Sequence, residues 1–116
     1  LRLSAAGRAV FLTTGTAATR GRAFWGPYGA TKAAMESLVR AWADEIEITP
    51  IRTAIVSPGA MRTRMRAAAY PGEDPETLPL PAEIAPLILE LADPGKVPPL
   101  ETISFPDWKL KAAQYA

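Results

Sequence analysis

The sequence predicts an α/β fold with a parallel sheet of about three strands and two main helices. Residues 9–12 are wholly apolar and residues 51–56 end in an apolar Ala-Ile-Val segment, which is typical of strands buried on both faces of a parallel sheet. The long segment between them has helical periodicity, so that strand, helix and strand form a crossover unit. Ligands of such sheets bind beyond the carboxyl ends of the strands, and the residues that follow each strand are therefore the first candidates for a site.

The principal helix should run from Gly29 to about Ile48. Two faces are expected along it, an apolar face that repeats mostly every four residues and a charged face. The apolar face comprises Ala30, Ala34, Leu38, Trp42 and Ile46, and the charged face comprises Glu36, Arg40, Asp44 and Glu47. Thr49-Pro50 should end the helix, because proline cannot continue it.

The remaining segments give weaker patterns. Residues 1–7 resemble a helix tail capped by Gly7. Ten of the twelve prolines lie from Pro58 onward, and residues 58–81 are therefore expected to form a stiff loop. A second helix should begin at Pro81 and reach about Ala92, and residues 100–105 should form a last short strand. Residues 107–116 give no functional signal.

Composition excludes several classes of function. The 116 residues suffice for one domain, and the net charge of +1, with acids and bases interspersed, does not favour nucleic acid as a partner. The absence of Cys and His removes thiolate catalysis and the commonest metal ligands, so no metal site is expected. No apolar segment approaches the ~20 residues of a membrane helix, and a soluble, cytoplasmic protein is expected.

Tyr28 and Lys32 lie one helical turn apart, so their side chains should project from the same face. An ammonium group beside a phenol stabilises the phenolate, and the pair therefore suits transfer of a proton to or from a reacting oxygen. The spacing alone is weak, because Tyr28 could pack at a helix start while Lys32 points to water. The surrounding sequence favours the functional interpretation.

Four features occur in a characteristic order: a Thr-rich strand end at residues 10–14, the Tyr28/Lys32 pair followed by Ala33 and Ala34, a second strand ending in Ser57-Pro58-Gly59, and Thr63 four residues later. In this combination the sequence resembles the short-chain dehydrogenase/reductase family, from about residue 8 to about residue 106. The resemblance implies that residues 1–116 are the C-terminal portion of a Rossmann-like, doubly wound NAD(P)-binding domain. The family's glycine-rich first turn has no counterpart, and NAD cannot be distinguished from NADP.

The family resemblance also implies a reaction and a set of site residues. The reaction would be hydride transfer between NAD or NADP and a small-molecule carbonyl or alcohol. Tyr28 would be the general acid/base and one of the cofactor-binding residues, Lys32 would favour its ionised form and hold the nicotinamide ribose, and Thr14 would hydrogen-bond the reacting oxygen. Pro58, Gly59 and Thr63 would seat the nicotinamide and its neighbouring phosphate.

The position of the family's catalytic Ser departs from this pattern. Counting thirteen residues back from Tyr28 gives Gly15, which has no hydroxyl. Matching Thr-Thr-Gly to the family's Thr-Ser-Gly assigns the role to Thr14 instead, with Thr16 as the second choice, because a Thr hydroxyl can donate a hydrogen bond as Ser does. Residues 14–21 also imitate the family's phosphate-binding turn, but Thr19 replaces its middle glycine, and Trp25-Gly26-Pro27 interrupts the path to a helix.

Two further expectations concern the lid and the partners. In the family the proline-rich segment covers the substrate, so Met61, Met65 and Tyr70 are candidate lid contacts, although a plain surface loop fits equally well. In the family the helix from Gly29 packs against its copy in a second subunit, so a homo-oligomer is expected, although core packing alone fits equally well. The strand at Val10 has a further neighbour in the family, which predicts association with a missing N-terminal half. The alternative function is a non-catalytic interaction or dimerisation module derived from the same family.

Overall fold

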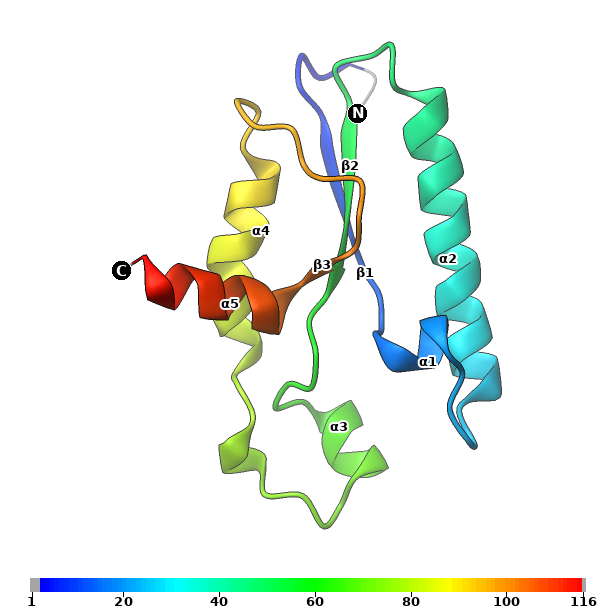
Figure 1. The fold of residues 1–116 in the computed structure, drawn as a ribbon, viewed down its shortest axis with the longest axis vertical. Helices are drawn as coiled ribbons and strands as arrows, with labels where there is room; N and C mark the ends of the chain where they lie inside the picture. The colour runs from blue at the N-terminus through cyan, green and yellow to red at the C-terminus, as the bar shows by residue number, and fades with distance from the viewer. Residues whose placement is uncertain (1–2, 116) are drawn as a thin grey trace.

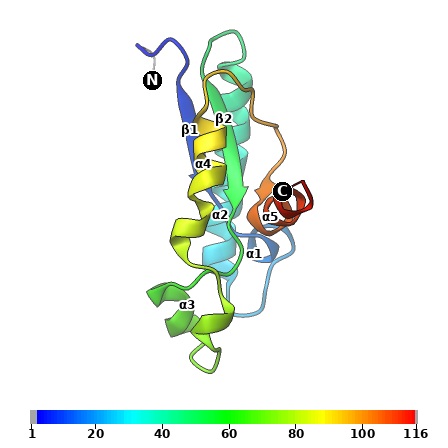
Figure 2. The ribbon, with the colours of Figure 1, turned by 90° about the vertical axis from the view of Figure 1, so that its left-hand side faces the viewer.

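The computed structural model describes residues 3–115, except the side chains of Thr16 and Ala17. A three-stranded parallel sheet lies between helix α2 (Gly26–Glu45) on one face and helix α4 (Ala85–Ala92) on the other (Figure 1). In the view of Figure 2, α4 lies in front of the strands and α2 lies behind them. The predicted α/β class, with three parallel strands and two main helices, is confirmed.

The strands are β1 (Arg8–Leu12), β2 (Arg52–Ser57) and β3 (Ile103–Ser104), in the order β1-β2-β3. The middle strand β2 is buried, with Val56 fully inaccessible, as its apolar sequence predicts. Within the described residues β1 pairs only with β2, which leaves its other edge open. The strand predicted at residues 100–105 is shorter than expected, because Pro106 favours a helix start and Ser104 caps that helix.

Helix α2 begins three residues earlier than predicted, because Pro27 suits the first turn of a helix. The prediction of its faces was partly wrong. Glu36 is buried, whereas Leu38 is 72% exposed and both Ala30 and Ala34 are exposed. The burial of Glu36 is tolerated because its carboxylate has partners, described below.

Short helices interrupt the segment predicted as a stiff loop. Helix α3 spans Arg64–Ala69, and two 3₁₀ turns cover Pro75–Thr77 and Pro81–Ile84 before α4. Thr63 caps α3 by accepting a hydrogen bond from the Arg66 amide. Two more helices were not predicted, α1 (Thr16–Thr19) and α5 (Phe105–Gln114). The helix predicted over residues 1–7 was wrong for residues 3–7, and residues 1 and 2 lie outside the described range.

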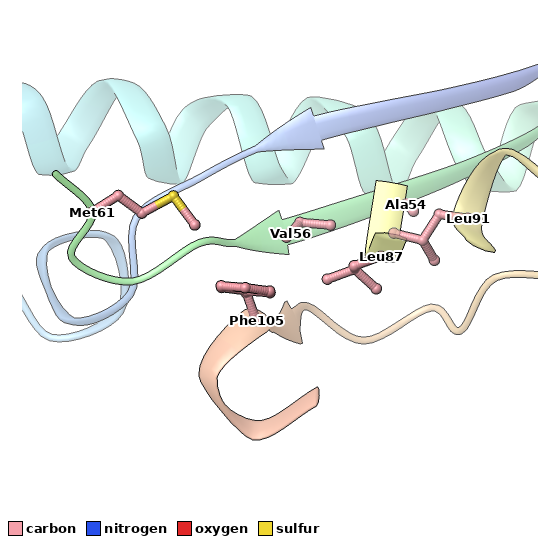
Figure 3. Close-up of a cluster of buried hydrophobic side chains, with 6 residues drawn as sticks. All are labelled: Ala54, Val56, Met61, Leu87, Leu91 and Phe105. Atoms are coloured by element: carbon pink, nitrogen blue, oxygen red, sulfur yellow. The ribbon is translucent and has the colours of Figure 1, made fainter. Parts of the chain in front are cut away.

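One apolar cluster joins the middle strand to the two helices on its α4 side (Figure 3). The cluster comprises Ala54 and Val56 of β2, Leu87 and Leu91 of α4, Phe105 at the start of α5, and Met61 from the loop that follows β2. Phe105 and Leu87 are each only 1% exposed, and burial of such side chains stabilises a fold by about 1.5–3 kcal/mol each. This packing fixes the carboxyl end of β2, which forms part of the site.

Two kinds of feature are missing from residues 3–115. None of the helices there is both long enough and apolar enough to cross a membrane. The same residues contain no cluster of three or more acidic side chains that could hold a metal ion.

Candidate active site

A cleft of about 580 Å³ opens at the carboxyl ends of β1 and β2. Five of the predicted site residues line it, which are Thr14, Tyr28, Pro58, Gly59 and Thr63. A second cavity, of about 530 Å³, lies between the second half of α2, the start of β2 and residues 97–100, and contains none of the predicted site residues. The cleft at the strand ends is therefore the candidate active site.

Tyr28 is half-buried in the first turn of α2 and lines the cleft. Trp25, the residue that precedes the helix, packs edge-to-face against the Tyr28 ring, with 5.5 Å between ring centroids. Such pairs are a preferred aromatic geometry. The start of α2 thus sets the direction of the phenol through backbone geometry and one neighbouring ring.

Lys32 lies one turn further along α2 and does not line the cleft itself. Its ammonium donates a hydrogen bond of 3.2 Å to the carbonyl of Leu12, the last residue of β1. Lys32 therefore ties the helix to the strand end beside Tyr28. This places the predicted pair on one helix face, next to the end of the first strand.

Thr14, the first candidate for the family's serine role, lines the cleft together with Gly15, the position reached by counting back from Tyr28. A Cβ atom built on Gly15 would lie 3.5 Å from Oγ of Ser57, at the end of β2. A side chain at position 15 would therefore point across to the neighbouring strand end in ordinary contact. Thr14 remains the candidate with a hydroxyl, whereas the side chain of Thr16 lies outside the described residues.

Gly59 turns the chain away from β2 in a conformation that favours glycine, with φ of +72°. Pro58 and Gly59 thereby present backbone to the cleft. Thr63 also lines the cleft, and its oxygen accepts the capping hydrogen bond from the Arg66 amide at 3.1 Å. Its hydroxyl proton is still able to donate to a bound group.

Of the three predicted lid residues, Met65 and Tyr70 line the cleft as outer contacts. Met65 is 61% exposed, which suits a residue at the mouth. Met61 also reaches the cleft but is only 9% exposed and belongs to the apolar core, as Figure 3 shows. Met61 therefore anchors the segment in the core, and Met65 and Tyr70 stay candidate lid contacts.

The segment that carries Arg66 and Tyr70 is attached to the loop before α2 by aromatic and charged contacts that were not predicted. The rings of Tyr70 and Trp25 stack with centroids 6.3 Å apart and an interplanar angle of 13°. The guanidinium of Arg66 lies 3.8 Å from the centroid of the Tyr70 ring, and that of Arg22 lies 5.6 Å from it. These contacts close one end of the cleft.

Arg66 also forms a two-pronged ion pair with Glu73, in which both N–H···O distances are 2.8 Å. Hydrogen bonding to Glu73 raises the pKa of Arg66, and hydrogen bonding to Arg66 lowers the pKa of Glu73. The sequence contained a signal for this ion pair that was not used. Arg66 and Glu73 carry opposite charges and lie on either side of the tight turn at Pro71-Gly72. Arg66 therefore differs from Arg64, two residues earlier, which is exposed.

A buried polar contact between the end of β1 and α2 was also not predicted. Thr13 and Glu36 are 5% and 6% exposed, and the Thr13 hydroxyl donates a hydrogen bond to Oε1 of Glu36. Arg40 pairs with the other carboxylate oxygen at 3.2 Å. The sequence did place Glu36 four residues after Lys32, and this spacing indicates that both side chains lie on the same face of the helix.

The fold and the cleft define a class of protein, the open parallel α/β sheets that bind a ligand at the strand ends. Residues 2–74 match the family of short chain dehydrogenases, and this chain belongs to that family. It is 46% identical over 88 residues to the uncharacterized oxidoreductase YciK of Escherichia coli (strain K12). That match covers 76% of this chain and 34% of YciK.

Solved structures agree with this assignment. A short chain dehydrogenase from Salmonella enterica serovar Typhi superposes with a TM-score of 0.82 at 39% identity, over 90% of this chain and 43% of that chain. A putative short chain dehydrogenase from Shigella flexneri 2a, solved in complex with NADP, gives a TM-score of 0.81 at 40% identity, over 90% of this chain and 43% of that one. The chain thus spans less than half the length of the relatives that it matches.

Proposed function

We propose that the protein acts as an oxidoreductase that moves a hydride between a nicotinamide dinucleotide, NAD or NADP, and the carbonyl or alcohol carbon of a small molecule. One observation carries the proposal: Tyr28 and Thr14 line the same cleft at the strand ends, with Lys32 one helical turn behind Tyr28. We further propose that residues 1–116 correspond to the C-terminal portion of the cofactor-binding domain. Membership of the short chain dehydrogenase family supports both proposals.

The residues of the cleft fit the nicotinamide end of such a cofactor. None of the described residues that line the cleft is acidic, whereas Arg22 and Arg66 are basic, which suits a ligand that carries phosphate. Pro58 and Gly59 offer close approach of backbone, and Thr63 offers a hydroxyl donor. We assign the nicotinamide and its neighbouring phosphate to these three residues and the ribose to Lys32. The NADP bound by the Shigella flexneri relative supports this class of cofactor.

A bound nicotinamide would supply or accept the hydride. Tyr28 would give its phenolic proton to the substrate oxygen during reduction and take it back during oxidation. Thr14 would donate a hydrogen bond to the same oxygen and hold it in place. The ammonium of Lys32 would stabilise the phenolate form of Tyr28, because a nearby positive charge favours the ionised phenol.

The walls of the cleft indicate what kind of substrate it would take. Most of its remaining lining is apolar or aromatic, including Leu12, Trp25, Met65, Tyr70 and Ile84. Such walls exclude water and favour a substrate with an apolar body around its carbonyl group. The alternative interpretation as a non-catalytic module gains no support from relatives described as dehydrogenases and oxidoreductases.

The test uses the complete natural gene product with NADH or NADPH and a panel of aldehydes and ketones, followed by loss of nicotinamide absorbance. Tyr28→Phe keeps the ring and removes the proton donor, so turnover should fall by roughly 10²–10⁴-fold. Tyr115→Phe is the matched control, because Tyr115 is 90% exposed and lies at the end of α5, away from the cleft. Near-normal turnover in Tyr28→Phe would remove Tyr28 from the mechanism and with it the proposed function.

A further inference from the structure

Three consecutive residues at the end of β1, Leu12, Thr13 and Thr14, line the cleft, and the first two also make hydrogen bonds to α2. The carbonyl of Leu12 accepts a hydrogen bond from Lys32, the hydroxyl of Thr13 donates to Glu36, and Thr14 lines the cleft. Tyr28, Lys32 and Glu36 follow one another at intervals of one helical turn, so all three lie on the same face of α2. The end of β1 is thus attached to the helix at two adjacent points.

Glu36 is a buried carboxylate with hydrogen-bond partners on both oxygens, and stable packing of α2 on the sheet does not require such a group. A carboxylate that is only 6% exposed is expensive to bury, and replacement of a buried ion pair by well-packed apolar side chains is often neutral or stabilising. Both oxygens of Glu36 are engaged, Oε1 by Thr13 and Oε2 by Arg40 at 3.2 Å. Arg40 in turn donates to the Thr102 hydroxyl, next to β3, also at 3.2 Å.

We propose that Glu36 is a positioning residue for the reaction, acting through Thr13 to set the place of Thr14 relative to Tyr28. This inference rests on the proposed function, in which Thr14 and Tyr28 share one substrate oxygen. Thr13 is the direct chain neighbour of Thr14, and its amide is held by the Val56 carbonyl at 2.9 Å. With the backbone fixed on one side by β2 and the hydroxyl fixed on the other by Glu36, Thr13 has little freedom to shift.

The reason to expect an effect on rate is geometric. A misplacement of about 1 Å in a reacting group can cost roughly 10²-fold in rate. Loss of the Thr13–Glu36 hydrogen bond removes the attachment nearest to Thr14 while leaving Tyr28 in its helix. The expected result is a fall in kcat with little change in the KM for the cofactor, because the residues assigned to cofactor binding lie after β2 or on α2.

The experiment compares variants that break the contact with variants that keep it, in the complete gene product. Thr13→Val and Glu36→Ala remove the donor and the acceptor, respectively. Thr13→Ser and Glu36→Gln each keep a group that can make the hydrogen bond. Arg40→Ala is the matched control for stability, because it removes the ion pair and the bond to Thr102 but leaves the Thr13–Glu36 contact in place.

Two measurements are made on each variant. Amide hydrogen exchange reports the protection of residues 12–14 without any need for turnover, and steady-state kinetics report kcat and KM. We expect Thr13→Val and Glu36→Ala to lose protection at residues 12–14 and to lose roughly 10-fold or more in kcat. Thr13→Ser and Glu36→Gln should recover most of both, and Arg40→Ala should lower the melting temperature while keeping kcat.

The outcomes separate this inference from the proposed function. If Thr13→Val and Glu36→Ala retain the parent's protection at residues 12–14, the inference is wrong whether or not the protein has turnover. If the parent shows turnover that depends on Tyr28 and both variants keep its kcat, the inference fails while the proposed function stands. If kcat falls in Arg40→Ala as far as in Thr13→Val, Glu36 only stabilises the fold.

Discussion

Gly59 lies against Pro106, so closely that a Cβ atom on Gly59 would be 3.0 Å from Cγ of the proline ring. The two residues are far apart in sequence, since Gly59 follows β2 and Pro106 opens α5. The contact joins the chain that leaves the middle strand to the last helix. Gly59 therefore meets two independent demands, a φ of +72° and the absence of a side chain.

Gly59→Ala should consequently destabilise the protein, by about 1–3 kcal/mol from backbone strain and crowding. Gly72→Ala is the matched control, because nothing lies within 4 Å of a Cβ atom there and its φ is not in the left-handed region. Urea unfolding followed by far-UV circular dichroism measures both changes. Equal stability of the two variants would contradict the assigned role of the Pro106 contact.

The sequence predicted those parts of the site that depend on local order along the chain. Tyr28 and Lys32 share a face because helical spacing requires it, and Thr14 and Gly59 reach one cleft because parallel strands end at the same edge. These relations follow from element type and order alone. They were therefore accessible without any knowledge of long-range packing.

The relations that were missed depend on contacts between distant segments. Glu36 was assigned to the charged face of the helix, whereas its burial depends on Thr13, which lies 23 residues away, together with Arg40. The stacking of Trp25 on Tyr70 likewise joins the loop before α2 to a segment that was predicted from its prolines as a stiff loop. Helix α5 was missed because its pattern is short and its apolar contact, Phe105, packs on residues of β2 and α4.

A strained residue next to the site offers a test of stability. Phe24 adopts φ of +69° and is fully exposed, so it has an unfavourable backbone conformation and no compensating burial. Phe24→Asn should raise the free energy of unfolding by up to about 1 kcal/mol, because Asn tolerates the left-handed region. Ile48→Asn is the control, since Ile48 is 98% exposed and has no positive φ. The prediction fails if thermal unfolding shows no gain for Phe24→Asn over Ile48→Asn.

The isolated 116-residue chain should self-associate, because two surfaces favour pairing. One is the open edge of β1, whose backbone groups can accept another strand, and the other is the exposed apolar stripe of Ala30, Ala34 and Leu38 on α2. Light scattering should give a mass above that of a monomer. A stable monomer across the accessible concentrations would contradict this expectation.

A charged substitution in the apolar stripe distinguishes association through α2 from association through the edge of β1. Leu38→Lys places a cation in the middle of the stripe, where Leu38 is 72% exposed, and should return the chain to a monomer if α2 mediates association. Leu110→Lys is the control on α5, at 65% exposure. If association is unchanged in both variants, the edge of β1 carries it.

The 116 residues alone should bind a nicotinamide dinucleotide only weakly, even if every role proposed above is correct. Most of the binding free energy of such a cofactor comes from a glycine-rich turn and a helix N-terminus that face the pyrophosphate. In this chain the segment that imitates the turn leads only into α1, a single turn from Thr16 to Thr19, and then into the loop before Trp25. The cleft therefore supplies contacts to the nicotinamide end and little beyond it.

Those contacts must offset the loss of translational and rotational freedom on binding, which is several kcal/mol, so a dissociation constant weaker than about 1 mM is expected. Titration of NADH and NADPH into the purified chain, followed by nicotinamide fluorescence, measures it directly. Tyr28→Phe should change this weak binding little, because the substitution removes one hydroxyl and keeps the ring. Saturation at micromolar cofactor would show instead that residues 14–21 form a working phosphate turn, and that the cleft at Tyr28 has been assigned to the wrong half of the fold.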